Sequence, residues 1–230
     1  MGHAMEWLGL RFITELTANG QVILNCTHDP FLVLLAYVVA CVGSFATLDM
    51  AERVGHVENP ASQRLWRWVG ASCLAGGIWA MHFIGMLAFQ APIDIQYDLP
   101  ITLLSLLIAL LASWLAMHTL SHPRLSFWQY LQASICIGLG IATMHYVGMS
   151  AMRSSAVAYY QPTLFALSIV IAIGASLAAL LISSHLRDGT GLFHQLLKYS
   201  ASLVLGAGIV SMHFTGMAAF NLVLPADSLQ

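Results

Sequence analysis

Three stretches of the chain repeat a histidine flanked by methionines. Each stretch reads Met-His-aromatic-x-Gly-Met, and the histidines are His82, His145 and His213. On a helix, a histidine and the methionine four residues later share one face. Imidazole with thioether is a soft to borderline ligand set, which favours copper, and Cu(I) in particular, over zinc, magnesium or calcium. The sequence therefore predicts a copper site made by these histidines and the motif methionines, which are Met81, Met86, Met144, Met149, Met212 and Met217.

The same repetition also has a purely structural interpretation. A methionine in an apolar helix usually only packs, and symmetry after duplication would keep packing residues in register. Recurrence of the Met, the His, the Gly and the second Met together favours metal binding, and packing stays the alternative. His28 precedes the first long apolar run. It is a candidate accessory ligand, or else it caps or solvates that end of the run.

The composition indicates whether the chain folds in water or in a lipid bilayer. The chain has 230 residues, of which 59% are hydrophobic and 8% charged, against roughly 45–50% and 25% in a soluble domain. Eight Lys and Arg with ten Asp and Glu cannot cover a soluble surface, so the composition excludes an ordinary cytosolic enzyme and indicates a bilayer. The net charge of −2, without a basic run, excludes a nucleic-acid surface. Four scattered cysteines without a Cys-x-x-Cys pair indicate neither a disulfide framework nor a thiolate zinc site.

Six apolar runs are long enough to cross a membrane as helices. They cover residues 31–50, 67–89, 100–120, 129–152, 163–185 and 199–223. The fold class predicted is an all-α membrane protein. Residues Met5 to Leu16 mix charged and apolar side chains, which predicts an amphipathic helix lying on the membrane surface.

The motif histidines are 63 and 68 residues apart, and this spacing equals one helix pair. A unit with two spans returns to the same side, so the three copies should be related by a pseudo-threefold axis along the membrane normal. Small residues let helices approach closely in lipid. The even-numbered spans carry such residues, so we expect them to form an inner ring; the glycines are Gly85, Gly148 and Gly216 after each His, and Gly76, Gly140 and Gly208 before it.

Basic residues predict the orientation. They concentrate in the loops after the first, third and fifth spans, which places those loops in the cytoplasm and both termini, with the motifs, on the outer side. The predicted divisions are an N-terminal periplasmic or interfacial segment (1–30), a six-helix domain (31–223) and a periplasmic tail (224–230). Asp49 precedes Arg53 by four residues near the cytoplasmic edge, which predicts a helical ion pair.

The sequences Met81-His82-Phe83, Met144-His145-Tyr146 and Met212-His213-Phe214 resemble the MHYT domain, a bacterial integral-membrane sensory module. The resemblance covers about residues 31–223. It implies a bacterial inner-membrane location and copper bound by the Met and His residues, through which oxygen, carbon monoxide or nitric oxide is sensed. It also implies fusion to cyclic-di-GMP synthesis and hydrolysis domains or to a histidine kinase. Phenylalanine replaces the family's tyrosine at Phe83 and Phe214, which leaves only the phenol of Tyr146.

The function predicted is a copper-containing membrane sensor that responds to a diatomic gas or to redox state and signals to an effector domain. The sequence has no paired carboxylates, nucleophile elbow or phosphate loop that would indicate an enzyme. A copper transporter or carrier is one alternative, and it would need a second metal-binding site among His118, His122 and His185. A haem-binding electron-transfer protein is another, because His and Met are also axial haem ligands.

Overall fold

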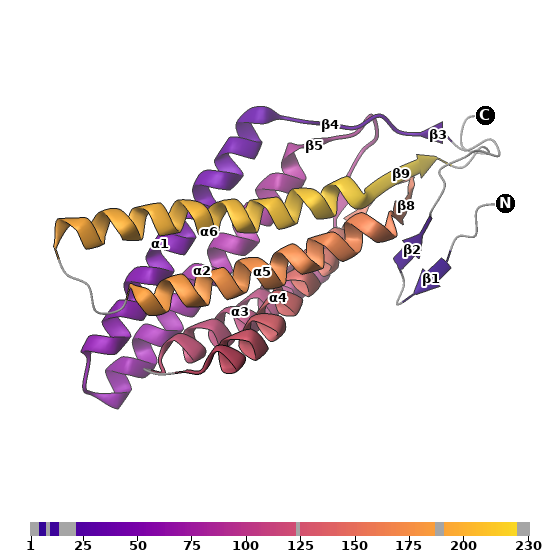
Figure 1. Cartoon of the computed structure of the whole chain (residues 1–230). Helices are drawn as coiled ribbons and strands as arrows, with labels where there is room; N and C mark the ends of the chain where they lie inside the picture. The colour runs from indigo at the N-terminus through magenta and orange to yellow at the C-terminus, as the bar shows by residue number, and fades with distance from the viewer. Residues whose placement is uncertain (1–4, 8–9, 14–21, 123–124, 187–190, 225–230) are drawn as a thin grey trace.

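The part of the chain that the structure describes forms a bundle of six long helices. The computed structural model describes residues 5–7, 10–13, 22–122, 125–186 and 191–224. All six helices are long and apolar enough to cross a membrane, so the protein is a multi-pass membrane protein and the predicted fold class is confirmed. The helices are α1 (Pro30–His56), α2 (Pro60–Ala88), α3 (Leu99–Leu120), α4 (Phe127–Ser150), α5 (Pro162–His185) and α6 (Leu192–Ala219) (Figure 1).

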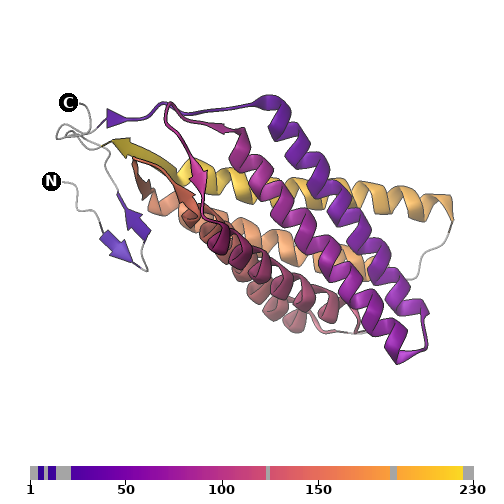
Figure 2. The ribbon, with the colours of Figure 1, turned by 180° about the vertical axis from the view of Figure 1, so that it is seen from behind.

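Short strands gather at one end of the bundle, which we call the strand end (Figures 1 and 2). The opposite end, where α1 meets α2, α3 meets α4 and α5 meets α6, is the loop end. A five-stranded sheet has the order β1-β2-β8-β9-β3, and two strand pairs are β4-β5 and β6-β7. The strands are β1 (Met5–Trp7), β2 (Leu10–Phe12), β3 (Val22–Ile23), β4 (Thr27–His28), β5 (Phe89–Gln90), β6 (Gln96–Tyr97), β7 (Met152–Arg153), β8 (Val157–Tyr160) and β9 (Phe220–Leu224).

The surface helix predicted for Met5 to Leu16 is wrong over the residues that the structure describes there. They form the antiparallel pair β1 and β2, and β2 continues into the sheet through β8, where Phe12 pairs with Tyr160. The Phe12 side chain is buried and lies edge-on to Phe165, with ring centroids 5.1 Å apart. Pairing with a distant strand overrides the local amphipathic pattern, because strand preference depends on the neighbours a segment meets.

Three equivalent backbone bonds at the strand end define the repeating unit. In each unit, the residue that caps the odd helix donates its N–H to a carbonyl six residues after the motif histidine. These bonds, 2.8–2.9 Å long, join Asp29 to Ala88, Asp98 to Ala151 and Gln161 to Ala219. The predicted two-helix unit, used three times, is thereby confirmed as α1–α2, α3–α4 and α5–α6.

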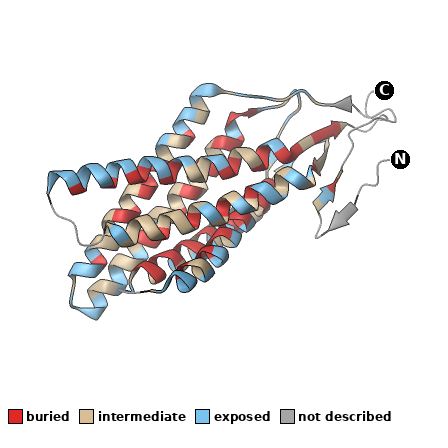
Figure 3. Cartoon of the chain, in the orientation of Figure 1, coloured by how far each residue is buried: buried red, intermediate tan, exposed pale blue. Residues whose placement is uncertain are grey.

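The even helices form the inner ring, as predicted. They bury a larger share of their residues than the odd helices do, and Figure 3 colours the buried residues along each helix red. Within each unit the two helices meet at small residues. A Cβ built on Gly140 would lie 2.8 Å from the Ala112 Cβ, and one on Gly208 would lie 3.0 Å from the Ala175 Cβ.

The equivalent contact in the first unit corrects the sequence analysis by one residue. A Cβ on Gly77 would lie 2.9 Å from the Gly43 Cα, whereas one on Gly76 would meet no atom within 4 Å. Gly77 lies five residues before His82, as its counterparts do before their histidines. Neighbouring helix positions differ by about 100°, so only one glycine of the pair can face α1.

Asp98 links the start of α3 to β7 at the strand end, and the contribution of its negative charge can be tested by mutation. Its carboxylate accepts the Ile101 N–H at 3.2 Å and contacts the Arg153 guanidinium at 3.2 Å. The Ile101 N–H and the Arg153 charge both hold the pKa of Asp98 below its usual value. A carboxyl group whose pKa is lower in the folded protein stabilises the fold at pH values above its unfolded pKa of about 3.9. This stabilisation is lost as the pH falls through the pKa of the folded state.

We therefore expect Asp98→Asn to lower the unfolding temperature of the detergent-solubilised protein slightly at neutral pH, because asparagine keeps the cap but not the charge. The difference from the parent protein should shrink as the pH is lowered from about 3.9, the unfolded value, through the lower pKa that Asp98 has in the folded protein. A difference that stays constant over this range would contradict the assignment.

Candidate metal centre

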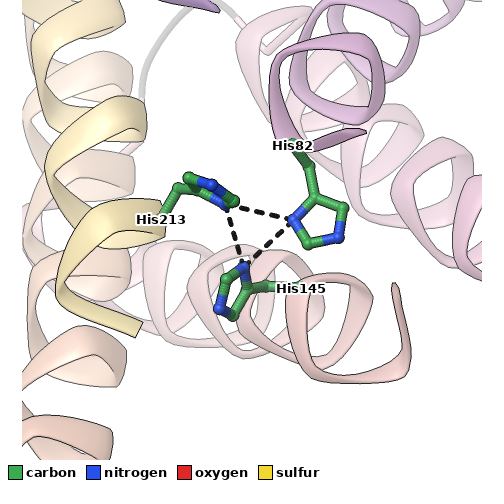
Figure 4. Close-up of side chains that lie close together, drawn as sticks. All are labelled: His82, His145 and His213. Carbon is green, nitrogen blue, oxygen red and sulfur yellow. Dashed lines mark hydrogen bonds between the residues drawn. The ribbon is translucent and has the colours of Figure 1, made fainter. Parts of the chain in front are cut away.

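Three inner helices bring the motif histidines together at one depth. His82 of α2, His145 of α4 and His213 of α6 are fully buried, and their rings point toward one another (Figure 4). The three Nδ1 atoms form a triangle with sides of 3.1, 3.1 and 3.2 Å. The ring planes are 82–88° apart. We call these residues the histidine triad, and its geometry follows the pseudo-threefold axis.

Each ring lies against a glycine of the next inner helix. A Cβ added at Gly148 would overlap the Nε2 of His82, one at Gly216 would overlap that of His145, and one at Gly85 would overlap that of His213. The glycine three residues after each histidine thus makes room for the histidine of another unit. The contacts run in one direction around the ring, from α2 to α4, from α4 to α6 and from α6 to α2.

Gly148→Ala is expected to destabilise the bundle. Its methyl group would overlap the His82 ring, and the opposite side of that ring faces His145 and His213, so the ring has no room to retreat. Overpacking of this kind costs about 1–3 kcal/mol. Chemical unfolding in detergent measures the loss.

Gly76→Ala is the matched control, because its methyl group would meet no atom within 4 Å. Alanine is the better helix former, so this variant should be as stable as the parent or slightly more so. Equal stability of the two variants would contradict the role assigned to Gly148.

Protons alone cannot satisfy the triad. A neutral imidazole has one proton on two nitrogens, so each Nδ1 is either a donor or an acceptor. Among three nitrogens in mutual contact, at least two are of the same kind, and the contact between those two is repulsive. Mutual hydrogen bonds, which the packing alternative would require, therefore satisfy at most two sides of the triangle.

A single cation would satisfy all three nitrogens at once. With every proton on Nε2, the three Nδ1 lone pairs converge on one point. An ion at a metal–nitrogen distance of about 2.0–2.1 Å can reach all three, because the corners are only 3.1–3.2 Å apart. In this arrangement the three Nε2–H groups are buried without an acceptor among the described residues and face the glycines of the neighbouring helices, a cost that ligation of all three Nδ1 atoms must outweigh. The donor set therefore fits a metal ion that imidazole ligates.

Comparison with known proteins agrees with this reading of the repeat. The family model described as the bacterial signalling protein N-terminal repeat, MHYT, matches residues 76–133, 138–195 and 206–227. These segments cover more than half of the chain. The chain belongs to the MHYT family. Each match begins on an inner helix, and each of the first two continues into the following odd helix. The family repeat therefore starts on an even helix, whereas the helix pairs defined above start on an odd one. Because the six helices close into a ring, both divisions describe the same repeat.

Several signalling proteins are similar to this MHYT chain. The cyclic di-GMP phosphodiesterase NbdA of Pseudomonas aeruginosa is 54% identical over 98% of this chain and 28% of its own length. The bifunctional diguanylate cyclase/cyclic di-GMP phosphodiesterase MucR of the same organism is 41% identical over 88% and 29%. The signaling protein YkoW of Bacillus subtilis is 32% identical over 85% and 24%. The chain thus spans less than a third of these relatives. No solved structure matches it.

The motif methionines of the MHYT repeats are all buried, but in two kinds of place. Met86, Met149 and Met217 belong to one apolar cluster on the strand-end side of the triad, together with Tyr146 and Phe220. The methionines that precede each histidine pack between helices, and Met81, for example, contacts the α1 cluster of Ala36 and Ala40. The first set therefore closes the strand-end side of the triad with apolar side chains. Ligation by any of these thioethers stays a prediction.

His28 lies outside the triad. Among the His, Cys, Asp and Glu residues of the described ranges, the one group placed to share a metal ion is His82, His145 and His213. His28 is exposed on β4 and lies edge-on to Phe89 and Phe214, with ring centroids 5.6 and 5.5 Å away. The rings of Phe89 and Phe214 shield one part of the imidazole from solvent, and this desolvation lowers the pKa of His28. The structure does not bring it to the ligand group, and its accessory role stays a prediction.

The family tyrosine that this chain keeps has a structural partner. The Tyr146 hydroxyl contacts the Ser168 hydroxyl of α5 at 2.6 Å, so its phenol joins α4 to α5. Phe83 and Phe214 at the equivalent positions lie edge-on to their own histidines, as Tyr146 does, with ring centroids 4.8 Å apart in all three cases. The aromatic ring, rather than the phenol, is the feature common to the three motifs.

A charge cluster at the loop end was found only in part by the sequence analysis. The predicted ion pair of Asp49 and Arg53 is confirmed, at 2.9 Å. Lys198 of α6, almost fully buried, contacts Asp49 at 3.2 Å and Glu52 at 2.5 Å. The signal in the sequence was a lysine within an apolar helix, which in a membrane protein requires a partner. Its partners could not be identified because they lie 146 and 149 residues away.

Proposed function

We propose that this chain is the copper-binding sensory domain of a membrane signalling protein. The observation that carries the proposal is the triangle of three buried Nδ1 atoms, whose contacts protons cannot satisfy together. Neutral imidazoles without carboxylates favour copper, and an apolar surrounding favours the monovalent ion, because one charge costs less than two away from water. When bound, copper supplies a centre that takes up oxygen, carbon monoxide or nitric oxide, or that changes valence.

The residues of the chain would hold the ion and pass on its state. The three Nδ1 atoms bind it, and the buried methionines of the strand-end cluster exclude water from one side. Each histidine ring lies against a glycine of another inner helix. A change in the size of the triad would therefore shift α2, α4 and α6 relative to one another, and this can bias an attached domain.

The attached domain is inferred from relatives. NbdA and MucR are named as cyclic di-GMP enzymes, and this chain matches less than a third of each. We infer that it has the same place in a protein whose effector makes or degrades cyclic di-GMP, with the catalytic steps outside the segment described here. The basic residues of the loop end support an orientation in the bacterial inner membrane with the loop end in the cytoplasm and the triad on the periplasmic side.

Neither alternative function gains support from the geometry. A haem takes axial ligands on opposite faces of a macrocycle, and Nδ1 atoms 3.1–3.2 Å apart leave no room for one. A copper transporter would need a second metal-binding site. Within the described ranges, His118, His122 and His185 do not join any group of three or more ligand side chains.

Metal analysis of the purified protein tests the proposal. After loading with Cu(I) in detergent and removal of weakly bound ions, we expect one copper per chain and no Soret band. Protein that retains no copper, or that carries haem in stoichiometric amount, would overturn the assignment.

A further inference from the structure

A cavity of about 70 Å³ lies on the bundle axis, on the loop-end side of the triad. The inner helices contribute three pairs of aliphatic side chains to its lining. Each pair lies four and eight residues before a motif histidine, so the lining repeats with the pseudo-threefold symmetry. The pairs are Ile78 and Leu74, Ile141 and Ile137, and Ile209 and Leu205.

Small residues on the odd helices leave this space open. Ala116 of α3 and Ala179 of α5 line the cavity at the repeat position that Thr47 has in α1. Ser44 and Ser176 also line it, at another equivalent position. Because small residues recur at the same places in different units, the opening belongs to the repeat and is not an isolated packing defect.

The chemistry of the lining favours an apolar occupant over a stably held water. A buried water needs two to four polar partners. The Thr47 hydroxyl already donates to the Gly43 carbonyl at 2.7 Å, and the Ser176 hydroxyl to the Ala172 carbonyl at 2.8 Å. Ser44 Oγ is buried without a partner in the described part of the chain. Ser183 supplies one further hydroxyl, and the rest of the lining is made of aliphatic side chains, alanine, glycine and the thioether of Met212.

The size of the cavity selects the occupant. A dry engineered cavity of about 150 Å³ binds benzene or xenon, and the cavity here has about half that volume. We propose that it binds one small, neutral, apolar molecule, of the size of a dissolved diatomic gas or a xenon atom. Such molecules partition into lipid and can reach a site inside a membrane bundle.

The place of the cavity suggests what this binding does. Met212, next to His213, lines it, and its aliphatic ring of Ile78, Ile141 and Ile209 is one helical turn, about 6 Å along the axis, from the triad. A gas held there would be stored beside the ligand centre. This storage role rests on the proposed function, whereas the binding itself does not.

Xenon is the probe for the test, measured by xenon NMR on metal-free protein in detergent. We expect saturable binding at one site. Ala116→Leu and Ala179→Leu, which fill the cavity from two different helices, should each weaken xenon binding at least tenfold. Leu180→Ala, which removes another lining side chain, should strengthen it. Ala166→Leu on α5, exposed on the outside of the bundle, is the matched control and should bind xenon as the parent does.

Xenon uptake that does not saturate, or that the two filling variants leave unchanged while they elute as folded protein, would overturn the proposal. Ordered water in the cavity of an experimental structure would do the same. Copper content is measured separately on the same preparations. Loss of copper with xenon binding retained would count against the proposed metal centre alone, and the converse against the gas site alone.

Discussion

Replacing any one of His82, His145 and His213 by alanine is expected to remove most of the bound copper. Each ring supplies one corner of the Nδ1 triangle, so each variant leaves a centre with two imidazoles. Changes in groups that merely orient a ligand weaken metal binding roughly 10–100-fold, and loss of a ligand should cost at least as much. Competition with a Cu(I) chelator, followed by metal analysis, measures the effect.

The control for these variants is His118→Ala. His118 lies on α3 and stacks on Trp114, with ring centroids 5.1 Å apart, away from the triad. It should keep the copper affinity of the parent protein. Three triad variants that all retain copper, while His118→Ala loses it, would place the metal elsewhere in the chain.

Lys198→Met is expected to cause the largest loss of stability outside the metal centre. The Lys198 ammonium group lies between the carboxylates of Asp49 and Glu52. The Lys198 side chain is 3% exposed, and those of Asp49 and Glu52 are 27% and 23% exposed. Removing one partner of a buried ion pair costs roughly 3–5 kcal/mol. Because the carboxylates retain some solvent, we expect the lower end, about 3 kcal/mol. Chemical unfolding in detergent measures it.

Two further variants separate charge from packing. Arg53→Met removes a guanidinium that pairs with the same Asp49, on a side chain that is 53% exposed, and this should cost under about 1 kcal/mol. The triple variant with Lys198→Met, Asp49→Asn and Glu52→Gln has no uncompensated buried charge, because the one charge that loses its partner is that of Arg53, whose side chain is half exposed. It should regain most of the loss. A triple variant no more stable than Lys198→Met would show that the lysine acts through packing.

The sequence was sufficient for the bundle and for the members of the triad. Apolar runs of about 20 residues have few stable forms in lipid, and the 63- and 68-residue spacing of the motif histidines fixes their common depth. The way the rings fit could not be predicted. Gly148 makes room for His82 of another unit, not for its own His145, and this depends on the direction in which the units follow one another around the axis.

Two other features depended on contacts between distant segments. The pairing of β2 with β8 joins residues 12 and 160, and no local pattern at either place indicates it. Lys198 meets its carboxylates across α1 and α6, the helices that close the ring. Local periodicity describes a helix and its faces, but it does not identify which distant helix covers a given face.

X-ray absorption at the copper edge counts the atoms bound to the ion and thereby distinguishes the histidine triad from any other set of copper ligands. For copper-loaded protein, we expect a shell of three imidazole nitrogens at about 2.0 Å, which falls to two in His145→Ala. A shell made of sulfur alone, or one that His145→Ala leaves unchanged, would contradict a copper centre held by the histidine triad.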